Sequence, residues 1–371
     1  MTHKTGKASL GIIGHAVVDE IFPGARYEIV GDRVIRIFIA DKQFDVPLLE
    51  PLHFCKVSAE VPEAMWRHTD HRQCGGGGPN SLVAAAESAP DLSIRYVEST
   101  KLDPIVVDYH RLPNVAVRSL DLRQLTRNAV LAGGSDKLIL RSVLPATVAK
   151  MSEVVSKLAW VCDCKWLLVN SPKDQVVFES LTEIAIKRRI PVCLVVTKFP
   201  DVQFVRKQLL PEVRAIIGSA DEIPTVMGWD CDQSFAGATR LVARLQECAP
   251  LAAVFVTLGE DGVLVAEPGS RTYWVRMNEE VRQMAQVQVA LDTTCLCGVG
   301  DAFSGGVASY LASPEPSILR RDSLMFESEV VAAAAAGTQV AVRWFGFDRD
   351  LVPSDFRVSS VSEITKMAVC A

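Results

Sequence analysis

Residues 298–306 read Gly298-Val299-Gly300-Asp301-Ala302-Phe303-Ser304-Gly305-Gly306, and a helix-like stretch runs from Ala302 to Leu311. Glycines directly before a helix let successive backbone N–H groups converge on an anion, and the positive end of the helix dipole adds to the attraction. A phosphoryl group that moves between two oxygens needs a cradle of this kind. The segment therefore predicts an anion-binding helix start formed by Gly298, Val299 and Gly300.

Asp301 follows these glycines directly. At a helix start, its carboxylate can accept the proton of a substrate hydroxyl while that oxygen attacks a terminal phosphate. Aspartate is also a common helix N-cap. From this segment alone, two interpretations of Asp301 stay open: a general base and a structural cap.

A second glycine-rich helix entrance occurs earlier, where Gly75-Gly76-Gly77-Gly78-Pro79-Asn80 precedes the helix-like Ser81 to Ser88. Asn80 is placed there to hydrogen-bond a ligand hydroxyl. The alternative is that the glycine-rich segment is only a flexible surface loop.

Asp19 lies just beyond the first predicted strand, in the region where ligands bind to open α/β sheets. Asp19 is a candidate hydrogen-bond acceptor for substrate hydroxyls, and the alternative is that it is an ordinary turn or cap residue.

Short apolar runs rich in β-branched residues predict buried strands, and helix-like stretches alternate with them. That rhythm predicts α/β architecture, with a doubly wound, mainly parallel sheet flanked by helices on both faces. The predicted strands are Leu10–Ile13, Ile94–Val97, Trp166–Val169, Val192–Val196, Ala215–Ile217 and Ala253–Thr257, and the predicted helices include Val176–Lys187 and Phe235–Cys248.

Residues 20–70 have a different pattern, with Tyr27–Val30 and Arg33–Ile39 separated by turn residues as in an antiparallel ribbon. A second pair, Asn128–Leu131 and Lys137–Leu140, flanks another turn. We expect a main domain of residues 1–19 and 71–371 and an inserted β-sheet lid of residues 20–70, joined by a ribbon at 128–141. The edge of this lid offers a surface for a homodimer.

Composition limits the classes of function. The 371 residues are 49% hydrophobic and carry a net charge of −5 without a basic block, which argues against a nucleic-acid partner. No signal-peptide core is present, and Gly337, Thr338 and Gln339 interrupt the longest Ala-rich stretch, so we expect no membrane span and a cytoplasmic location. The ten cysteines lack zinc-site spacing and are expected to be reduced thiols.

A further glycine turn, Thr257-Leu258-Gly259 with Gly262, lies between two predicted strands. In their order along the chain, the Gly75-Gly76 segment with Asn80, this turn and Gly298-Val299-Gly300-Asp301 resemble the ribokinase-like, phosphofructokinase-B type carbohydrate kinases. The resemblance runs from about Leu10 to about Phe347. It implies substrate binding by Asp19, Gly75, Gly76 and Asn80, nucleotide binding by Thr257, Gly259 and Gly262, an anion hole at Gly298 and Gly300, and Asp301 as the base. It also implies ATP with Mg²⁺.

The chain departs from the family pattern in two places. Where the family has Asn-x-x-Glu, tied to magnesium and phosphate, this chain has Ser219-Ala220-Asp221-Glu222; Glu222 is retained and is expected to reach the metal through water. Cys295-Leu296-Cys297 stands between Asp292-Thr293-Thr294 and Gly298, so activation by a monovalent cation such as potassium stays open. The two cysteines are either small buried hydrophobes or thiols beside the phosphate.

The sequence therefore predicts an ATP-dependent kinase that phosphorylates a hydroxyl of a sugar or nucleoside, without identifying which. One alternative is a noncatalytic ligand-binding protein of the same fold. Another is a nicotinamide-dependent oxidoreductase, although the Gly-x-Gly-x-x-Gly fingerprint is missing near Gly11 and Gly14. Walker-type and protein-kinase catalytic-loop patterns are also absent.

Overall fold

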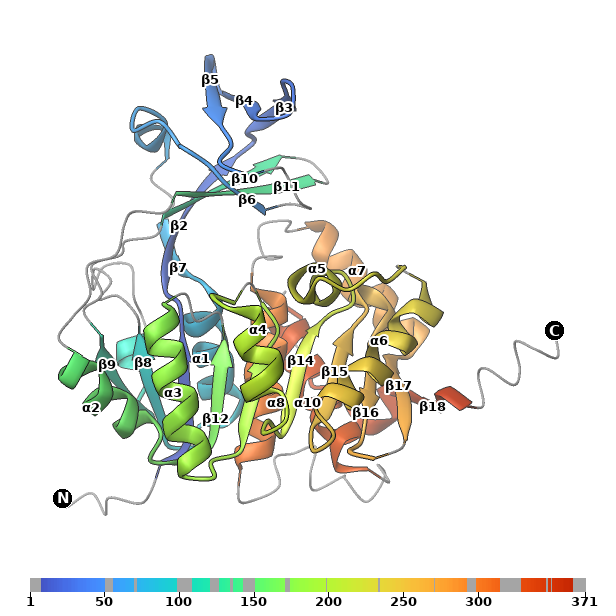
Figure 1. Cartoon of the computed structure of the whole chain (residues 1–371). Helices are drawn as coiled ribbons and strands as arrows, with labels where there is room; N and C mark the ends of the chain where they lie inside the picture. Colours follow the sequence, from blue (N-terminus) through green and yellow to red (C-terminus); the bar gives the residue numbers. More distant parts are fainter. Residues whose placement is uncertain are drawn as a thin grey trace.

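The computed structural model describes residues 8–50, 56–69, 72–98, 109–120, 127–133, 136–142, 151–170, 174–197, 199–232, 234–269, 271–291, 298–313, 328–344, 346–347 and 349–362. These residues form a large sheet covered by helices and two smaller sheets that project from one side of it (Figure 1).

Within the described residues, the large sheet has ten strands in the order β9-β8-β1-β12-β13-β14-β15-β16-β17-β18. The strands from β9 to β15 are parallel, and β15 to β18 pair antiparallel. Their bounds are β1 Ala8–Gly14, β8 Ile94–Glu98, β9 Val115–Ser119, β12 Cys164–Asn170, β13 Val192–Val195, β14 Ala215–Ser219, β15 Ala253–Thr257, β16 Val263–Ala266, β17 Thr272–Met277 and β18 Phe356–Ser360.

Helices pack on both faces of this sheet because alternate strand residues point to opposite sides. Leu10 and Ile12 join the core formed with α1 (Gly77–Ser88), α8 (Val299–Ala312) and α10 (Glu329–Trp344). Ile13 joins the other core, with α2 (Met151–Val161), α3 (Gln175–Lys187) and α6 (Phe235–Cys248). The other α-helices of the described residues are α4 (Val202–Phe204), α5 (Glu222–Met227) and α7 (Glu279–Leu291). None of the helices in the described ranges is long and apolar enough to cross a membrane.

The smaller sheets together form what we call the small β unit. One has the order β6-β11-β10-β2-β7 and the other the order β3-β4-β5, and a separate apolar core that includes Phe22, Ile35 and Leu140 lies in this unit. Figure 1 shows it above the large sheet. The bounds are β2 Val17–Pro23, β3 Arg26–Ile29, β4 Val34–Ile39, β5 Lys42–Pro47, β6 Lys56–Ser58, β7 Arg72–Gly75, β10 Arg127–Gly133 and β11 Asp136–Ser142.

The predicted fold class is confirmed: a mostly parallel sheet with helices on both faces, accompanied by a small separate sheet. Both predicted antiparallel ribbons form, as β3–β4 and β10–β11. Two helices begin earlier than the sequence suggests, α1 at Gly77 and α8 at Val299. Each follows a glycine with positive φ, Gly76 at +96° and Gly298 at +85°, and this conformation is strained for other residues.

Candidate active site

The carboxyl ends of the parallel strands meet along one edge of the large sheet. Gly14, the last residue of β1, lies between Glu98 of β8 and Asn170 of β12. Farther along this edge, Ser219 of β14 pairs with Thr257 of β15. Ligands of open α/β sheets bind beyond such strand ends, so this edge is the expected position of a ligand site.

The carboxylate of Asp301 is held at this edge by two amide groups. Asn80 Nδ2 donates to Asp301 Oδ2 at 3.1 Å, and Asn170 Nδ2 donates to Oδ1 at 3.0 Å. Ser81 Oγ donates to the backbone carbonyl of Asp301 at 2.9 Å. Asp301 lies in the first turn of α8, where Gly298 occupies the N-cap position, so Asp301 is not the cap of this helix. Both carboxylate oxygens therefore have a fixed direction.

Asn170 is a site residue that the sequence interpretation missed. Its side chain is fully buried, and its Nδ2 also lies 3.0 Å from the carbonyl of Gly77 and 2.9 Å from Ser81 Oγ. It therefore links the end of β12 to the first turns of α1 and α8. The available signal was a polar residue directly after the predicted strand Trp166–Val169, at the sheet edge that binds ligands.

The start of α8 has the features of an anion-binding helix end. The first N–H groups of an α-helix have no acceptor within the helix, and the helix dipole is positive there. A Cβ at Gly298 would overlap Asn80 Nδ2, so a side chain at this position would displace Asn80. Gly300 is exposed, and a Cβ there would meet open space. The backbone of Val299 and Gly300 thus borders Asp301 on an open side of the helix.

Asp19 lies where the small β unit joins the large sheet. It is only 6% exposed, and Asn128 Nδ2 of β10 donates to its Oδ1 at 2.7 Å. A Cβ at Gly75 would overlap the Asp19 carboxylate, and one at Gly76 would overlap the backbone oxygen of His15. Glycine at both positions lets the chain entering α1 pass close to Asp19.

The predicted nucleotide residues form a second group at the same sheet edge. Leu258 N donates to the carbonyl of Gly262 at 2.8 Å, which closes the turn that contains Gly259 between β15 and β16. Thr257 Oγ1 donates to the carbonyl of Gly218 at 3.4 Å. Beside it, the backbone N–H of Glu222 donates to Ser219 Oγ at 3.0 Å. The turn, Ser219 and Glu222 therefore lie around neighbouring strand ends.

A magnesium ion fits the donor types of this second group. Glu222 is exposed at the start of α5, and Ser219 adds a hydroxyl oxygen. Mg²⁺ bound with a nucleotide typically takes one or two carboxylates together with phosphate oxygens and water. Within the described ranges, no cluster of three His, Cys, Asp or Glu side chains could hold a metal by itself. Asp292, Thr293, Cys295 and Cys297 lie outside the described residues.

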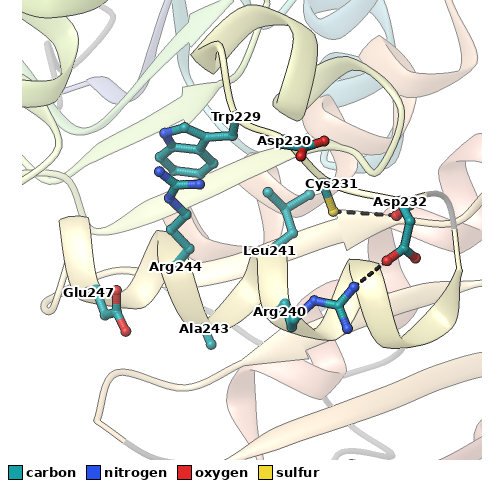
Figure 2. Close-up of a pocket in the computed structure, with 9 residues that line it drawn as sticks. All are labelled: Trp229, Asp230, Cys231, Asp232, Arg240, Leu241, Ala243, Arg244 and Glu247. Carbon is teal, nitrogen blue, oxygen red and sulfur yellow. Dashed lines mark hydrogen bonds and ion pairs between the residues drawn. The ribbon is translucent and has the colours of Figure 1, made fainter.

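A separate cavity of about 590 Å³ lies between α6 and the loop after α5 (Figure 2). The Arg244 guanidinium stacks 4.4 Å from the centre of the Trp229 ring, and Arg240 pairs with Asp232. Ser234 also donates to Asp232 and, with Arg240, holds the pKa of this carboxyl below its ordinary value. Arg240 and Asp232 compensate each other's charge, and none of the predicted site residues lines the cavity.

The chain was compared with known proteins by sequence and by structure. The family model described as "pfkB family carbohydrate kinase" matches residues 144–342, and no curated protein sequence matches.

Among solved structures, the chain is similar to a ribokinase from Giardia lamblia at 16% identity, covering 98% of this chain and 99% of that one, with a TM-score of 0.61. It is similar to an adenosine kinase from Sinorhizobium meliloti at 14% identity, covering 98% and 100%, with a TM-score of 0.60. A ribokinase from Arabidopsis thaliana, complexed with ribose and ATP, is 16% identical over 91% and 99%, with a TM-score of 0.53. These structures share the fold. Since the family model spans more than half of the 371 residues, the chain belongs to the pfkB family of carbohydrate kinases.

Proposed function

We propose that this protein transfers the γ-phosphoryl group of ATP to a hydroxyl of a sugar or nucleoside, with Asp301 as the general base. The observation that supports this most is the carboxylate of Asp301, which accepts hydrogen bonds from Asn80 and Asn170 beside the open start of α8. A base must be oriented toward the proton that it removes, and the two amides orient it.

In the proposed reaction, the substrate hydroxyl gives its proton to Asp301 as its oxygen forms a bond to the γ-phosphorus. The bond between the γ-phosphorus and the bridging oxygen breaks, and ADP leaves with the electron pair. Negative charge on the transferring group lies against the N–H groups of Gly298, Val299 and Gly300, where the helix dipole favours it. Such transfers depend mainly on positioning and electrostatics, and this arrangement provides both.

In this proposal, the acceptor binds at Asp19, Gly75, Gly76 and Asn80. Asp19 accepts hydrogen bonds from substrate hydroxyls, and the two glycines let the substrate approach the backbone. Most of the small β unit acts as the lid, which consists of residues 20–70 joined by the ribbon at 128–141. The rest of residues 1–19 and 71–371 forms the main domain, to which β7 and the start of β2 connect the lid. A closed lid excludes water, which otherwise competes as an acceptor.

The nucleotide binds at Thr257, Gly259 and Gly262, with its phosphates directed toward α8. Glu222, through water, and Ser219 would hold Mg²⁺, which would neutralise phosphate charge. The complex of the Arabidopsis ribokinase with ribose and ATP supports a nucleotide site in this fold. A cytoplasmic location and a homodimer through the lid edge stay predictions.

The second candidate is a ligand-binding protein of the same fold without catalysis, because a fold does not establish an activity. The ordered Asp301 carboxylate favours an enzyme, and the family match disfavours a nicotinamide-dependent oxidoreductase. Purified protein incubated with Mg²⁺, γ-labelled ATP and a panel of sugars and nucleosides separates the candidates. We expect label on at least one acceptor; binding of acceptor and ATP without transfer would favour the noncatalytic candidate.

A further inference from the structure

Three polar residues lie side by side on one face of the five-stranded sheet of the small β unit. Asn128 pairs with Asp19 on one neighbouring strand and with Arg141 on the other. We call Asp19, Asn128 and Arg141 the polar row. Paired residues on adjacent strands point to the same side. Leu138 and Leu140, which point to the side of β11 opposite to Arg141, lie in the apolar core of the small β unit. The polar row therefore faces away from that core.

This face points toward the large sheet. Glu222, at the start of α5, interacts electrostatically with Arg141, as does Glu50 of the small β unit. Figure 1 shows β11 and β6 above α5. At the other end of the row, the carboxylate of Asp19 lies against Gly75, at the entrance to α1. The row therefore lies on the side of the small β unit that faces α5 and the entrance to α1.

Arg141 keeps a positive charge on this face of the small β unit. Burial lowers the pKa of its guanidinium, and Glu50 and Glu222 act in the opposite direction; arginine stays charged near neutral pH. Within the described part of the chain, Arg141 forms no ion pair with a carboxylate. Glu50 already accepts hydrogen bonds from the backbone and hydroxyl of Ser58, and Glu222 is the carboxylate proposed to face Mg²⁺. With magnesium–ATP bound, Arg141 is therefore available to an anion.

Asn128 contributes an acceptor that needs a donor. Its Nδ2 donates to Asp19, but its Oδ1 is buried and has no hydrogen-bond partner in the described part of the structure. Buried amide oxygens are nearly always paired, and an exception calls for an explanation such as a ligand group. A substrate hydroxyl that donates to Asn128 Oδ1 would satisfy it, and a second hydroxyl of the same substrate would donate to the adjacent Asp19 carboxylate.

We propose that the polar row selects an acceptor that carries an acidic group as well as hydroxyls, such as a sugar carboxylate or a sugar phosphate. The hydroxyls bind Asp19 and Asn128, and the carboxylate or phosphate binds Arg141. Asp19 and Arg141 lie two strands apart, roughly 10 Å at the spacing of neighbouring strands, which suits a sugar-sized molecule with its acid at one end. This proposal rests on the proposed function and specifies its substrate class.

The first experiment compares anionic and neutral acceptors with the full-length protein. Gluconate, glucose 6-phosphate and fructose 6-phosphate are tested beside glucose, fructose, ribose and adenosine, by calorimetric binding and by label transfer from ATP. We expect an anionic member to bind at least tenfold more tightly than its neutral counterpart. Comparison of gluconate with the sugar phosphates shows whether the site prefers a carboxylate or a phosphate. Tightest binding by a neutral member, or no binding by any anionic member, overturns the proposal. Transfer to neutral acceptors only would overturn it while upholding the kinase.

The second experiment uses Arg141→Met, with Arg36→Met as the matched control. Arg36 lies in the same small β unit, on β4, but pairs with Glu28 and Asp45 at the surface. We expect Arg141→Met to weaken binding of the anionic acceptor about tenfold or more, as for a charge-assisted hydrogen bond, and Arg141→Lys to restore part of it. The affinity of Arg141→Met for the neutral counterpart and for ATP should stay unchanged. Arg36→Met should bind all of these ligands with unchanged affinity. Weaker ATP binding with unchanged acceptor binding would assign Arg141 to the nucleotide and overturn the proposal.

Discussion

Removing the amide of Asn170 should slow phosphoryl transfer without weakening either substrate. Asn170 Nδ2 lies 3.0 Å from Asp301 Oδ1, and Asn80 holds the other carboxylate oxygen. In Asn170→Ala, the carboxylate keeps one of its two amide contacts and can rotate away from the acceptor hydroxyl. A hydrogen bond to a charged group contributes about 1.5–3 kcal/mol. If most of this orients Asp301, kcat should fall roughly tenfold to hundredfold, because about 1.4 kcal/mol corresponds to a factor of ten.

The same substitution should also lower stability, since Asn170 is fully buried and donates to groups of α1. We expect a loss of about 1–3 kcal/mol in the free energy of unfolding, typical of unpaired buried acceptors. Asn114→Ala is the matched control. Asn114 Nδ2 also lies near three acceptors, the carbonyls of Ala86, Ala89 and Leu92, at 3.1–3.3 Å, but it does not contact Asp301.

The assay measures kcat and both KM values at a temperature where each variant is folded, with thermal unfolding measured in parallel. Asn170→Ala should lose kcat with nearly unchanged KM for ATP and acceptor, whereas Asn114→Ala should lose stability alone. The reasoning is refuted if the two variants lose stability equally and both keep a kcat within twofold of the unmodified protein.

Three further perturbations test other parts of the account. Gly300→Ala should stabilise α8 by about 1 kcal/mol because its Cβ meets open space, yet lower turnover because the new methyl group narrows the approach of the phosphate. Gly298→Ala should instead destabilise the fold, because Gly298 has a φ of +85° and a Cβ there would overlap Asn80. Unfolding curves and kcat measure these effects, and full activity of Gly300→Ala would contradict the anion hole. Glu222→Gln should raise the free Mg²⁺ needed for half-maximal activity several-fold, and an unchanged magnesium titration would remove Glu222 from metal binding. Burial raises the pKa of the Cys162 thiol from 9.0 to about 12, so only the unfolded chain ionises it between these values, and stability should fall as pH rises through that range, by at most about 1.4 kcal/mol per pH unit. Urea midpoints at pH 8 and pH 10 measure the fall, and Cys162→Ala should reduce it; an equal fall in that variant would locate the effect elsewhere.

The sequence predicted the strands of the large sheet well because each has a local signature. Leu10–Ile13 and Ala253–Thr257 are short β-branched or apolar runs bounded by turn residues, and both lie within observed strands. Helix starts were harder to predict. Gly77, Gly78 and Pro79 are poor residues for a helix interior, but the left-handed Gly76 lets the first turn of α1 begin there.

Contacts between distant parts of the chain were the main limit for the site. Asp301, Asn80 and Asp19 could be proposed from glycine-rich helix entrances and a strand end. Asn170 and Asn128 could not, because their roles depend on hydrogen bonds to Asp301 and Asp19, more than a hundred residues away in the chain. Arg141 likewise acquires its position only from the pairing of β10 with β2 and β11.

The central claim is that Asp301 removes the proton of the acceptor hydroxyl, and Asp301→Asn tests it most directly. The variant keeps the size of the side chain, and thermal unfolding and calorimetric ATP binding establish that fold and nucleotide site are intact. Single-turnover transfer from γ-labelled ATP then measures the chemical step. The account predicts unchanged ATP binding and a transfer rate lower by about a hundredfold or more, as expected for loss of a general base. A folded variant that binds ATP and transfers phosphate at a near-normal rate would contradict it.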